Sequence, residues 1–278
     1  NIDPIEKKPL YHYLPGSRSY SMATFGCNFK CPFCQNWQIS QREASSVHIS
    51  PERAVELALE ENRRTGMCVG ISYTYSEPLV WYEYVFDTAR LAREKGLKNV
   101  LVTNGYVNRE PLERLVGLID AMNIDVKSFT DDFYRRMCKG RLDPVLRTVE
   151  MARKHGHVEL TCLLIPTLND GREEISRLVA WVASLDREIP LHFSRYFPRY
   201  QFRLPPTPLA TLRMAREIAR EKLSFVYIGN VAEEGEGNDT HCPNCGALLV
   251  SRYGFSARIV GLEGRKCGRC GRDIRMVV

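Results

Sequence analysis

The chain has 278 residues, of which 44% are hydrophobic and 26% charged, and this suits one large α/β domain with or without a small module. Its net charge of +6 is uneven, because seven arginines and lysines and two acidic residues give residues 241–278 a charge of +5. The first 240 residues are nearly neutral, so we do not expect the whole chain to attract nucleic acid. No apolar run approaches the roughly 20 residues of a membrane span, so we expect no membrane partner.

The pattern along the chain predicts an N-terminal arm, a large core, a linker and a small tail. Residues 1–18 contain three prolines and a glycine, which predict an arm without regular elements. Apolar strands and amphipathic helices then alternate through a core at 19–232, followed by an acidic linker at 233–240 and a cysteine-rich tail at 241–278. Strands are predicted at 19–25, 68–73, 99–103, 121–126, 158–164, 191–195 and 224–228. Helices are predicted at 51–65, 78–95, 110–116, 143–155, 173–185 and 207–222.

Nearly continuous apolar strands that alternate with helices indicate a parallel sheet covered by helices. A complete barrel of this kind has eight strand–helix units. Six units and a final strand therefore predict a partial, TIM-like (β/α)6 barrel that stays open on one side.

Seven of the ten cysteines fall into three tight clusters. Such clusters in a chain without a secretory signal are metal sites more often than disulfides, so we expect a reducing, cytoplasmic compartment. The first cluster, Cys27, Cys31 and Cys34, has C-x3-C-x2-C spacing directly after the first predicted strand. Four-iron clusters usually take four cysteines and structural zinc takes four ligands. Three thiolates therefore predict a metal with an open coordination position.

Polar residues also lie at the carboxyl ends of the next five predicted strands, from 68–73 to 191–195. Parallel barrels carry their functional groups at these ends. Each also has a simpler structural interpretation. Glu77 can cap a helix, Asn104 can form a turn, Asp125 and Lys127 can form an ion pair, and His192 can be a core histidine. The candidate site residues at these ends are Tyr75, Ser76, Glu77, Asn104, Asp125, Lys127, Pro166, His192 and Arg195.

The tail contains two C-x-x-C-G knuckles, which together predict a closed, structural four-cysteine metal site. Its ligands are Cys242, Cys245, Cys267 and Cys270. Zinc is the expected metal, and a rubredoxin-like iron would use the same ligands. Glycine after each pair permits the positive φ of a tight turn. The positive charge of the tail predicts either an acidic partner or docking onto the acidic residues 233–236.

The C-x3-C-x2-C loop, with an aromatic residue before its last cysteine, resembles the radical SAM superfamily. The resemblance implies a [4Fe-4S] cluster on Cys27, Cys31 and Cys34 that binds S-adenosylmethionine (SAM) through its fourth iron. It implies reductive cleavage of SAM to a 5′-deoxyadenosyl radical, which abstracts a hydrogen atom. It also implies SAM contacts from Phe33 on adenine, Asn36, Tyr75, Ser76, Glu77, Asn104, Asp125, Lys127 and Pro166, and substrate contacts from His192 and Arg195. Related activating enzymes have Gly-Gly-Glu where this chain has Tyr75-Ser76-Glu77.

Several stretches in order resemble the AmmeMemoRadiSam-system radical SAM family, a relative of pyruvate formate-lyase activating enzymes. These stretches are 3–10, 14–17, 34–41, 73–78, 192–195, 205–208 and 227–230. The resemblance implies an anaerobic oxidoreductase with a flavodoxin- or ferredoxin-type electron donor. The open barrel favours a protein substrate, such as a backbone glycine. Family members usually carry a further cysteine-rich N-terminal segment, so we expect the chain to be a fragment or that segment to be dispensable.

A competing hypothesis from the sequence makes the chain a non-catalytic, metal-bearing binding module. In this hypothesis the basic cysteine ribbon recognises nucleic acid or an acidic protein, and the barrel is only a scaffold. It predicts salt-dependent association and an unoccupied first cysteine cluster.

Overall fold

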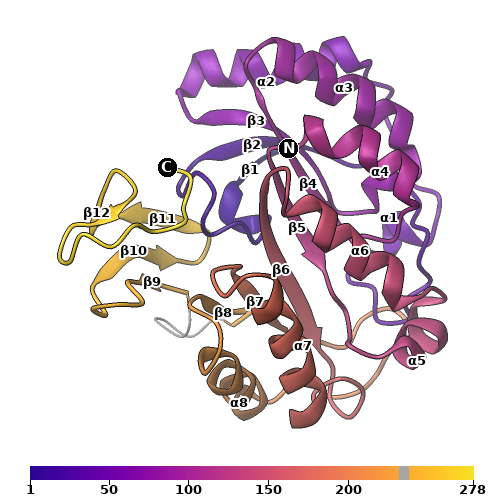
Figure 1. Cartoon of the computed structure of the whole chain (residues 1–278). Helices are drawn as coiled ribbons and strands as arrows, with labels where there is room; N and C mark the ends of the chain where they lie inside the picture. Colours follow the sequence, from indigo (N-terminus) through magenta and orange to yellow (C-terminus); the bar gives the residue numbers. More distant parts are fainter. Residues whose placement is uncertain (232–237) are drawn as a thin grey trace.

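All seven predicted core strands assemble in chain order into one sheet, which gains one further strand at its start (Figure 1). The structure is a computed structural model and describes residues 1–231 and 238–278. Strand β1 pairs antiparallel with β2, and each later neighbour pair from β2 to β8 is parallel. Strands β1 and β8 are the two edges of this sheet in the described residues, so the predicted partial barrel is confirmed. The sheet strands are β1 (Ile2–Pro4), β2 (Arg18–Met22), β3 (Cys68–Tyr73), β4 (Lys98–Thr103), β5 (Ala121–Asp125), β6 (His157–Leu164), β7 (Leu191–Arg195) and β8 (Val226–Gly229).

The six predicted helices connect these strands and cover the outer face of the sheet, as Figure 1 shows. They are α2 (Pro51–Thr65), α3 (Tyr82–Glu94), α4 (Arg109–Leu115), α6 (Leu142–Ala152), α7 (Arg172–Leu185) and α8 (Leu209–Arg220). The sequence analysis did not predict the short helices α1 (Trp37–Ser40) and α5 (Asp131–Phe133) or the π-helix Tyr134–Cys138. The predicted helix 78–95 begins as a separate 3-10 turn, Pro78–Trp81. Within the described residues, no helix is long and apolar enough to cross a bilayer.

The N-terminal arm is more ordered than predicted. The prediction of no regular element in 1–18 is wrong, because β1 and a 3-10 turn (Ile5–Lys7) lie in this segment. Ile5, Leu10 and Tyr13 are buried in a cluster with Val100 and Ala121, at the starts of β4 and β5. These three arm residues therefore fill the barrel near the starts of β4 and β5.

The C-terminal module packs against this same end. It contains β9 (Thr240–His241), β10 (Leu248–Tyr253), β11 (Ser256–Ile259), β12 (Leu262–Glu263) and β13 (Lys266–Cys267). Its buried residues Leu249 and Ile274 share one hydrophobic cluster with Tyr11 of the arm and Tyr227 of β8. Residues 233–237 of the predicted linker lie outside the described residues. The predicted docking of the tail onto 233–236 therefore stays a prediction. The module is thus continuous with the barrel core.

A close approach of β3 to β4 gives a stability prediction. A Cβ atom at Gly70 would lie 1.9 Å from the backbone oxygen of Lys98. We expect Gly70→Ala to lower the free energy of unfolding by about 3 kcal/mol, because the backbone of a central strand pair must move. The matched control is Gly117→Ala, since a Cβ there meets nothing within 4 Å. Thermal unfolding followed by circular dichroism measures both, and equal melting temperatures for the two variants would contradict this packing.

Candidate active site and metal centre

A cavity of about 430 Å³ lies at the carboxyl end of the sheet and reaches from the cysteine loop to the N-terminal arm. Most of the predicted site residues line it, although they come from different strand ends. Those residues are Cys27, Cys31, Phe33, Cys34, Asn36, Tyr75, Ser76, Glu77, Asn104, Asp125, Lys127 and His192. The structure therefore brings this set together around one space. Their binding roles stay predictions.

Two predicted residues do not line the cavity. Pro166 is buried in the loop after β6. Arg195 donates from Nε to the backbone oxygen of Thr207 at 2.8 Å, and its guanidinium lies 5.0 Å from the centre of the Phe197 ring. These contacts hold Arg195 among loop residues, so a substrate contact from its present position has no support.

An amide network fixes the cysteine loop. The Asn104 side chain donates from Nδ2 to Asn28 Oδ1 at 2.8 Å and lies 3.6 Å from the Cys27 sulfur. Asn28 in turn donates to the backbone oxygen of Tyr106 at 2.7 Å, and Asn104 Oδ1 accepts from the Tyr106 N–H at 2.8 Å. Both ends of the Asn104 amide are therefore engaged. Asn104 therefore forms the turn that was the simpler interpretation, through Oδ1 and the Tyr106 N–H, and its Nδ2 also contacts the cysteine loop.

The donor set of this loop fits an iron–sulfur cluster better than a single ion. Three thiols from eight residues line the cavity, and the Phe29 N–H points to the Cys27 sulfur at 3.4 Å. Backbone N–H donors of this kind tune the sulfurs of clusters. The three sulfurs do not form a tight group of the kind that the C-terminal cysteines form within the described residues. Burial raises the pKa of Cys27 to about 12, so a metal must displace its proton.

Glu77 is buried, and three donors hold its carboxylate. Oε1 accepts from Thr103 Oγ1 at 2.7 Å and from the Leu79 N–H at 3.0 Å, and Oε2 accepts from the Asn104 N–H at 2.8 Å. Glu77 caps the 3-10 turn that starts at Pro78, so the simpler interpretation of this residue as a helix cap is confirmed. Burial raises the pKa of Glu77 to about 7. The carboxylate also lines the cavity, where an ammonium group would favour its ionised form.

Tyr75 takes the backbone conformation that a glycine would take. Its φ is 70°, which is uncommon for a residue with a large side chain. Its hydroxyl hydrogen-bonds to Asp3 of β1, and the ammonium of the buried Lys8 lies 4.4 Å from its ring centre. Its backbone oxygen accepts from Asn36 Nδ2 at 2.8 Å. The arm thus stabilises the left-handed backbone conformation of Tyr75.

Asp125 and Lys127 form the ion pair that the sequence offered as the simpler interpretation, with Nζ and Oδ2 2.8 Å apart. Burial acts to lower the pKa of Lys127, but the Asp125 carboxylate and the other groups around it hold the pKa well above its ordinary value. Lys127 is therefore a permanent cation at the cavity wall.

The structure adds a buried carboxylate that the sequence analysis missed. Glu159 of β6 accepts from the His12 N–H at 2.6 Å and from Nε2 of His157 and His192 at 2.9 and 2.7 Å. Burial acts to raise the pKa of Glu159, but the hydrogen bonds from His157 and His192 hold it well below its ordinary value. The signal was a single acidic residue within an otherwise apolar predicted strand. His192 is therefore oriented by Glu159 as it lines the cavity.

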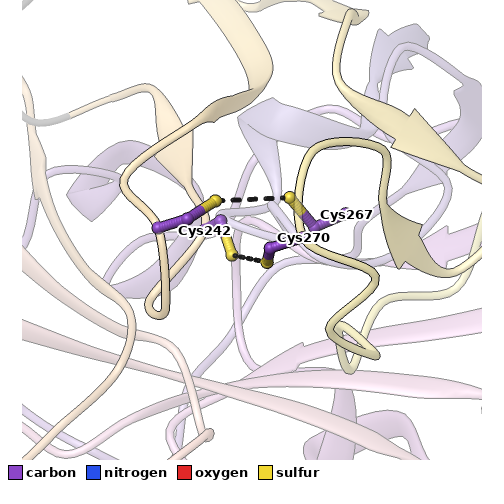
Figure 2. A group of neighbouring side chains, drawn as sticks. Cys242, Cys267 and Cys270 are labelled. Atoms are coloured by element: carbon purple, nitrogen blue, oxygen red, sulfur yellow. Dashed lines mark hydrogen bonds between the residues drawn. The ribbon is translucent and has the colours of Figure 1, made fainter.

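The four C-terminal cysteines form a tight tetrad, three of which Figure 2 labels. Their sulfurs all lie within 4.8 Å of one another, with 3.6 Å between Cys242 and Cys270 and 3.7 Å between Cys245 and Cys267. Tetrahedral zinc with bonds of about 2.3 Å places its sulfurs about 3.8 Å apart. Gly246 and Gly271 have φ of 72° and 73°, as predicted for the two knuckles. The tetrad can hold one metal ion, and zinc fits its geometry.

The basic side chains of the C-terminal module are partly used inside the molecule. Arg272 and Arg275 pair with Glu188 and Asp186, which precede β7. Arg252 is buried and donates to the backbone oxygen of Tyr11 at 2.6 Å. These contacts dock the module onto the barrel. Arg252 is thereby removed from the free surface that the binding-module hypothesis requires, whereas Arg272 and Arg275 stay at least partly exposed.

The fold and the site together are those of an open parallel barrel with three thiols in a cavity at its carboxyl end. A family model for the radical SAM superfamily matches residues 22–179, so the chain belongs to that superfamily. It is related to the pyruvate formate-lyase-activating enzyme of Clostridium pasteurianum, with 25% identity over 55% of this chain and 64% of that enzyme. The narrower AmmeMemoRadiSam-system assignment stays a prediction.

Two further comparisons extend over more of the chain. An uncharacterized protein of Methanocaldococcus jannaschii is 49% identical to this chain, and the match covers 100% of this chain and 83% of that protein. The crystal structure of Streptococcus suis SuiB bound to S-adenosylmethionine has a TM-score of 0.59 at 17% identity, covering 81% of this chain and 53% of that one. At that identity the likeness shows the fold alone.

The raised pKa of Glu77 predicts a pH dependence of stability. Because folding raises this pKa from 4.5 to about 7, the protonated form is favoured in the folded state. The stabilisation is complete below pH 4.5 and is lost as the pH rises through 7, by about 3 kcal/mol. We expect the free energy of unfolding of Glu77→Gln to lack this loss between pH 4.5 and 7. Urea unfolding of both proteins from pH 4.5 to 8 measures the two free energies, and a difference between them that stays constant with pH would contradict the prediction.

The two cysteine sets predict separable metal contents. We expect anaerobically reconstituted protein to hold about four irons and one zinc. Cys27→Ala should lower the iron content and keep zinc, and Cys270→Ala should lower zinc and keep iron. Metal analysis by mass spectrometry checks this, and loss of both metals in either variant would show that the sites are not independent.

Proposed function

We propose that this chain is a radical SAM enzyme that uses a [4Fe-4S] cluster to cleave S-adenosylmethionine reductively and abstract a hydrogen atom from a substrate. The observation that carries the proposal is the set of three thiols from one loop, lining a cavity at the carboxyl end of a parallel sheet. When bound, the cluster and SAM supply one-electron cleavage of a sulfonium S–C bond and hydrogen-atom abstraction.

The side chains around the cavity have roles in binding and orientation under this proposal. Cys27, Cys31 and Cys34 would hold the cluster. Glu77 and Lys127 would take the amino and carboxylate groups of SAM, because both side chains line the cavity and the SAM ammonium would favour the ionised form of Glu77. Phe33 is buried and lines the same cavity, where its ring offers a surface for adenine and excludes water.

The identity of the substrate and of the other partners belongs to the proposal. The sequence relationship to activating enzymes supports a protein substrate. A flavodoxin or ferredoxin would supply the electron, and zinc would fill the C-terminal tetrad.

The experiment measures 5′-deoxyadenosine after anaerobic reconstitution with iron and sulfide, addition of SAM and reduction with dithionite. We expect product from the unmodified protein and a loss of at least about 100-fold in Cys27→Ala, because a missing thiolate removes the cluster. The matched control is Cys68→Ala, a buried cysteine of β3 that does not line the cavity. Equal, background-level product from all three proteins would contradict the proposed function.

A further inference from the structure

Strands β6, β7 and β8 form one part of the cavity wall. The residues that line the cavity here are Thr161, His192, Ser194, Gly229 and Asn230, and we call these five residues the β6–β8 wall. None of them is among the residues predicted to bind the cluster or SAM. Under the proposed function, this wall therefore faces the space that remains for the substrate.

Two polar side chains of the β6–β8 wall already have partners in the protein. Thr161 donates from Oγ1 to Asn123 Oδ1 at 2.9 Å. Asn230 donates from Nδ2 to the backbone oxygen of Arg195 at 3.2 Å. These two side chains are engaged in holding the wall, so a ligand gains least by contacting them.

His192 and Ser194 differ, because each keeps one polar atom without a partner. His192 Nδ1 and Ser194 Oγ make no hydrogen bond within residues 1–231 and 238–278, and neither belongs to the occluded polar atoms of that part of the chain. Both residues line the cavity. A ligand in the cavity can therefore reach these two atoms.

The contacts of His192 decide what its free nitrogen can do. The carboxylate of Glu159 accepts from Nε2 at 2.7 Å and is held ionised by its hydrogen bonds, so Nε2 carries the ring proton. In the uncharged ring, Nδ1 then has a lone pair and acts as an acceptor. The ring centres of Tyr11 and Tyr227 lie 4.7 and 5.1 Å from that of His192 and keep the ring in this orientation.

Ser194 offers a hydroxyl on the same face of β7. It lies two residues after His192, so the two side chains leave the strand on one face, about 7 Å apart. Its neighbour in β8 is Gly229, where a Cβ atom would lie 2.9 Å from Ser194 Oγ. The glycine therefore leaves the hydroxyl uncovered, as a possible donor beside the His192 acceptor.

We propose that His192 Nδ1 accepts a hydrogen bond from an uncharged N–H group of the substrate, while Ser194 Oγ donates to an oxygen of the same group. A carboxamide has this combination and, with its two hydrogen bonds, can span the distance between the two side chains. This assignment rests on the proposed function, and it adds the chemical class of the substrate group. A carboxylate fits less well, since it has no hydrogen for Nδ1 and would bring a second negative charge near Glu159.

The test uses the full chain with cluster and zinc loaded, under anaerobic conditions, with excess SAM and without reductant. Isothermal titration calorimetry compares butyramide with 2-pentanone and butyrate, which replace the amide NH2 by a methyl group and by a charged oxygen. We expect butyramide to bind at least about fivefold more tightly than 2-pentanone, with butyrate weakest, because only butyramide supplies a donor to Nδ1. Equal binding of butyramide and 2-pentanone, or tightest binding of butyrate, would overturn the proposal.

Nitrogen-15 NMR of histidine-labelled protein reads the state of the ring directly. We expect the His192 signals, identified by their loss in His192→Phe, to show a proton on Nε2 and a lone pair on Nδ1. Butyramide should shift the Nδ1 signal, and 2-pentanone should leave it in place. A proton on Nδ1, or an Nδ1 signal that ignores butyramide, would contradict the assignment.

Two variants test the two atoms separately. We expect Ser194→Ala to lose at least about threefold in butyramide affinity, and His192→Phe at least about fivefold, because each removes one hydrogen bond. His155→Phe changes an exposed histidine that does not line the cavity, and it should bind butyramide as the unmodified protein does. If Ser194→Ala and His192→Phe also bind butyramide normally, the β6–β8 wall is structural and the assignment fails.

The outcome can be separated from that of the proposed function. Production of 5′-deoxyadenosine by the unmodified protein depends on the cysteine loop and SAM, and amide binding depends on the β6–β8 wall. Product without selective amide binding rejects the assignment of the wall alone. Selective amide binding without product rejects the proposed function and shows an amide-binding cavity.

Discussion

The structure depends on how the charged groups inside the barrel are neutralised. Glu159 is fully buried and accepts hydrogen bonds from the arm and from two histidines of β6 and β7. Leaving such a carboxylate without donors would cost several kcal/mol. The arm must therefore be docked for the barrel interior to be stable. Arg252 extends the same network into the C-terminal module through its bond to Tyr11.

This docking also shapes the two ends of the cavity. At the cysteine end, Asp3 and Lys8 hold the Tyr75 side chain while its backbone keeps a left-handed conformation. At the other end the arm contributes Glu6 and Tyr11 to the wall. A segment that looks peripheral in the sequence thus contacts the cavity wall and the C-terminal module.

The sequence predicted the barrel strands well because buried parallel strands are nearly continuous apolar runs, as at Val100, Leu101 and Val102 of β4. It identified the C-terminal tetrad and the cysteine loop that lines the cavity because metal-ligand spacing is local. It predicted an arm at 1–18 but missed the order of the arm, since the prolines and the glycine argued against regular elements. Only tertiary pairing makes the burial of Asp3 and Lys8 tolerable. The displacement of Arg195 from the cavity also depends on a loop contact, to Thr207, that no local pattern encodes.

The proposed cluster would have three thiolate ligands and one iron open at the cavity. Mössbauer spectroscopy of protein reconstituted with ⁵⁷Fe, with and without SAM, tests this arrangement most directly. We expect SAM to shift the signal of one iron in four and to leave the other three unchanged. Four iron signals that do not respond to SAM, or a protein that binds no iron at Cys27, Cys31 and Cys34, would contradict it.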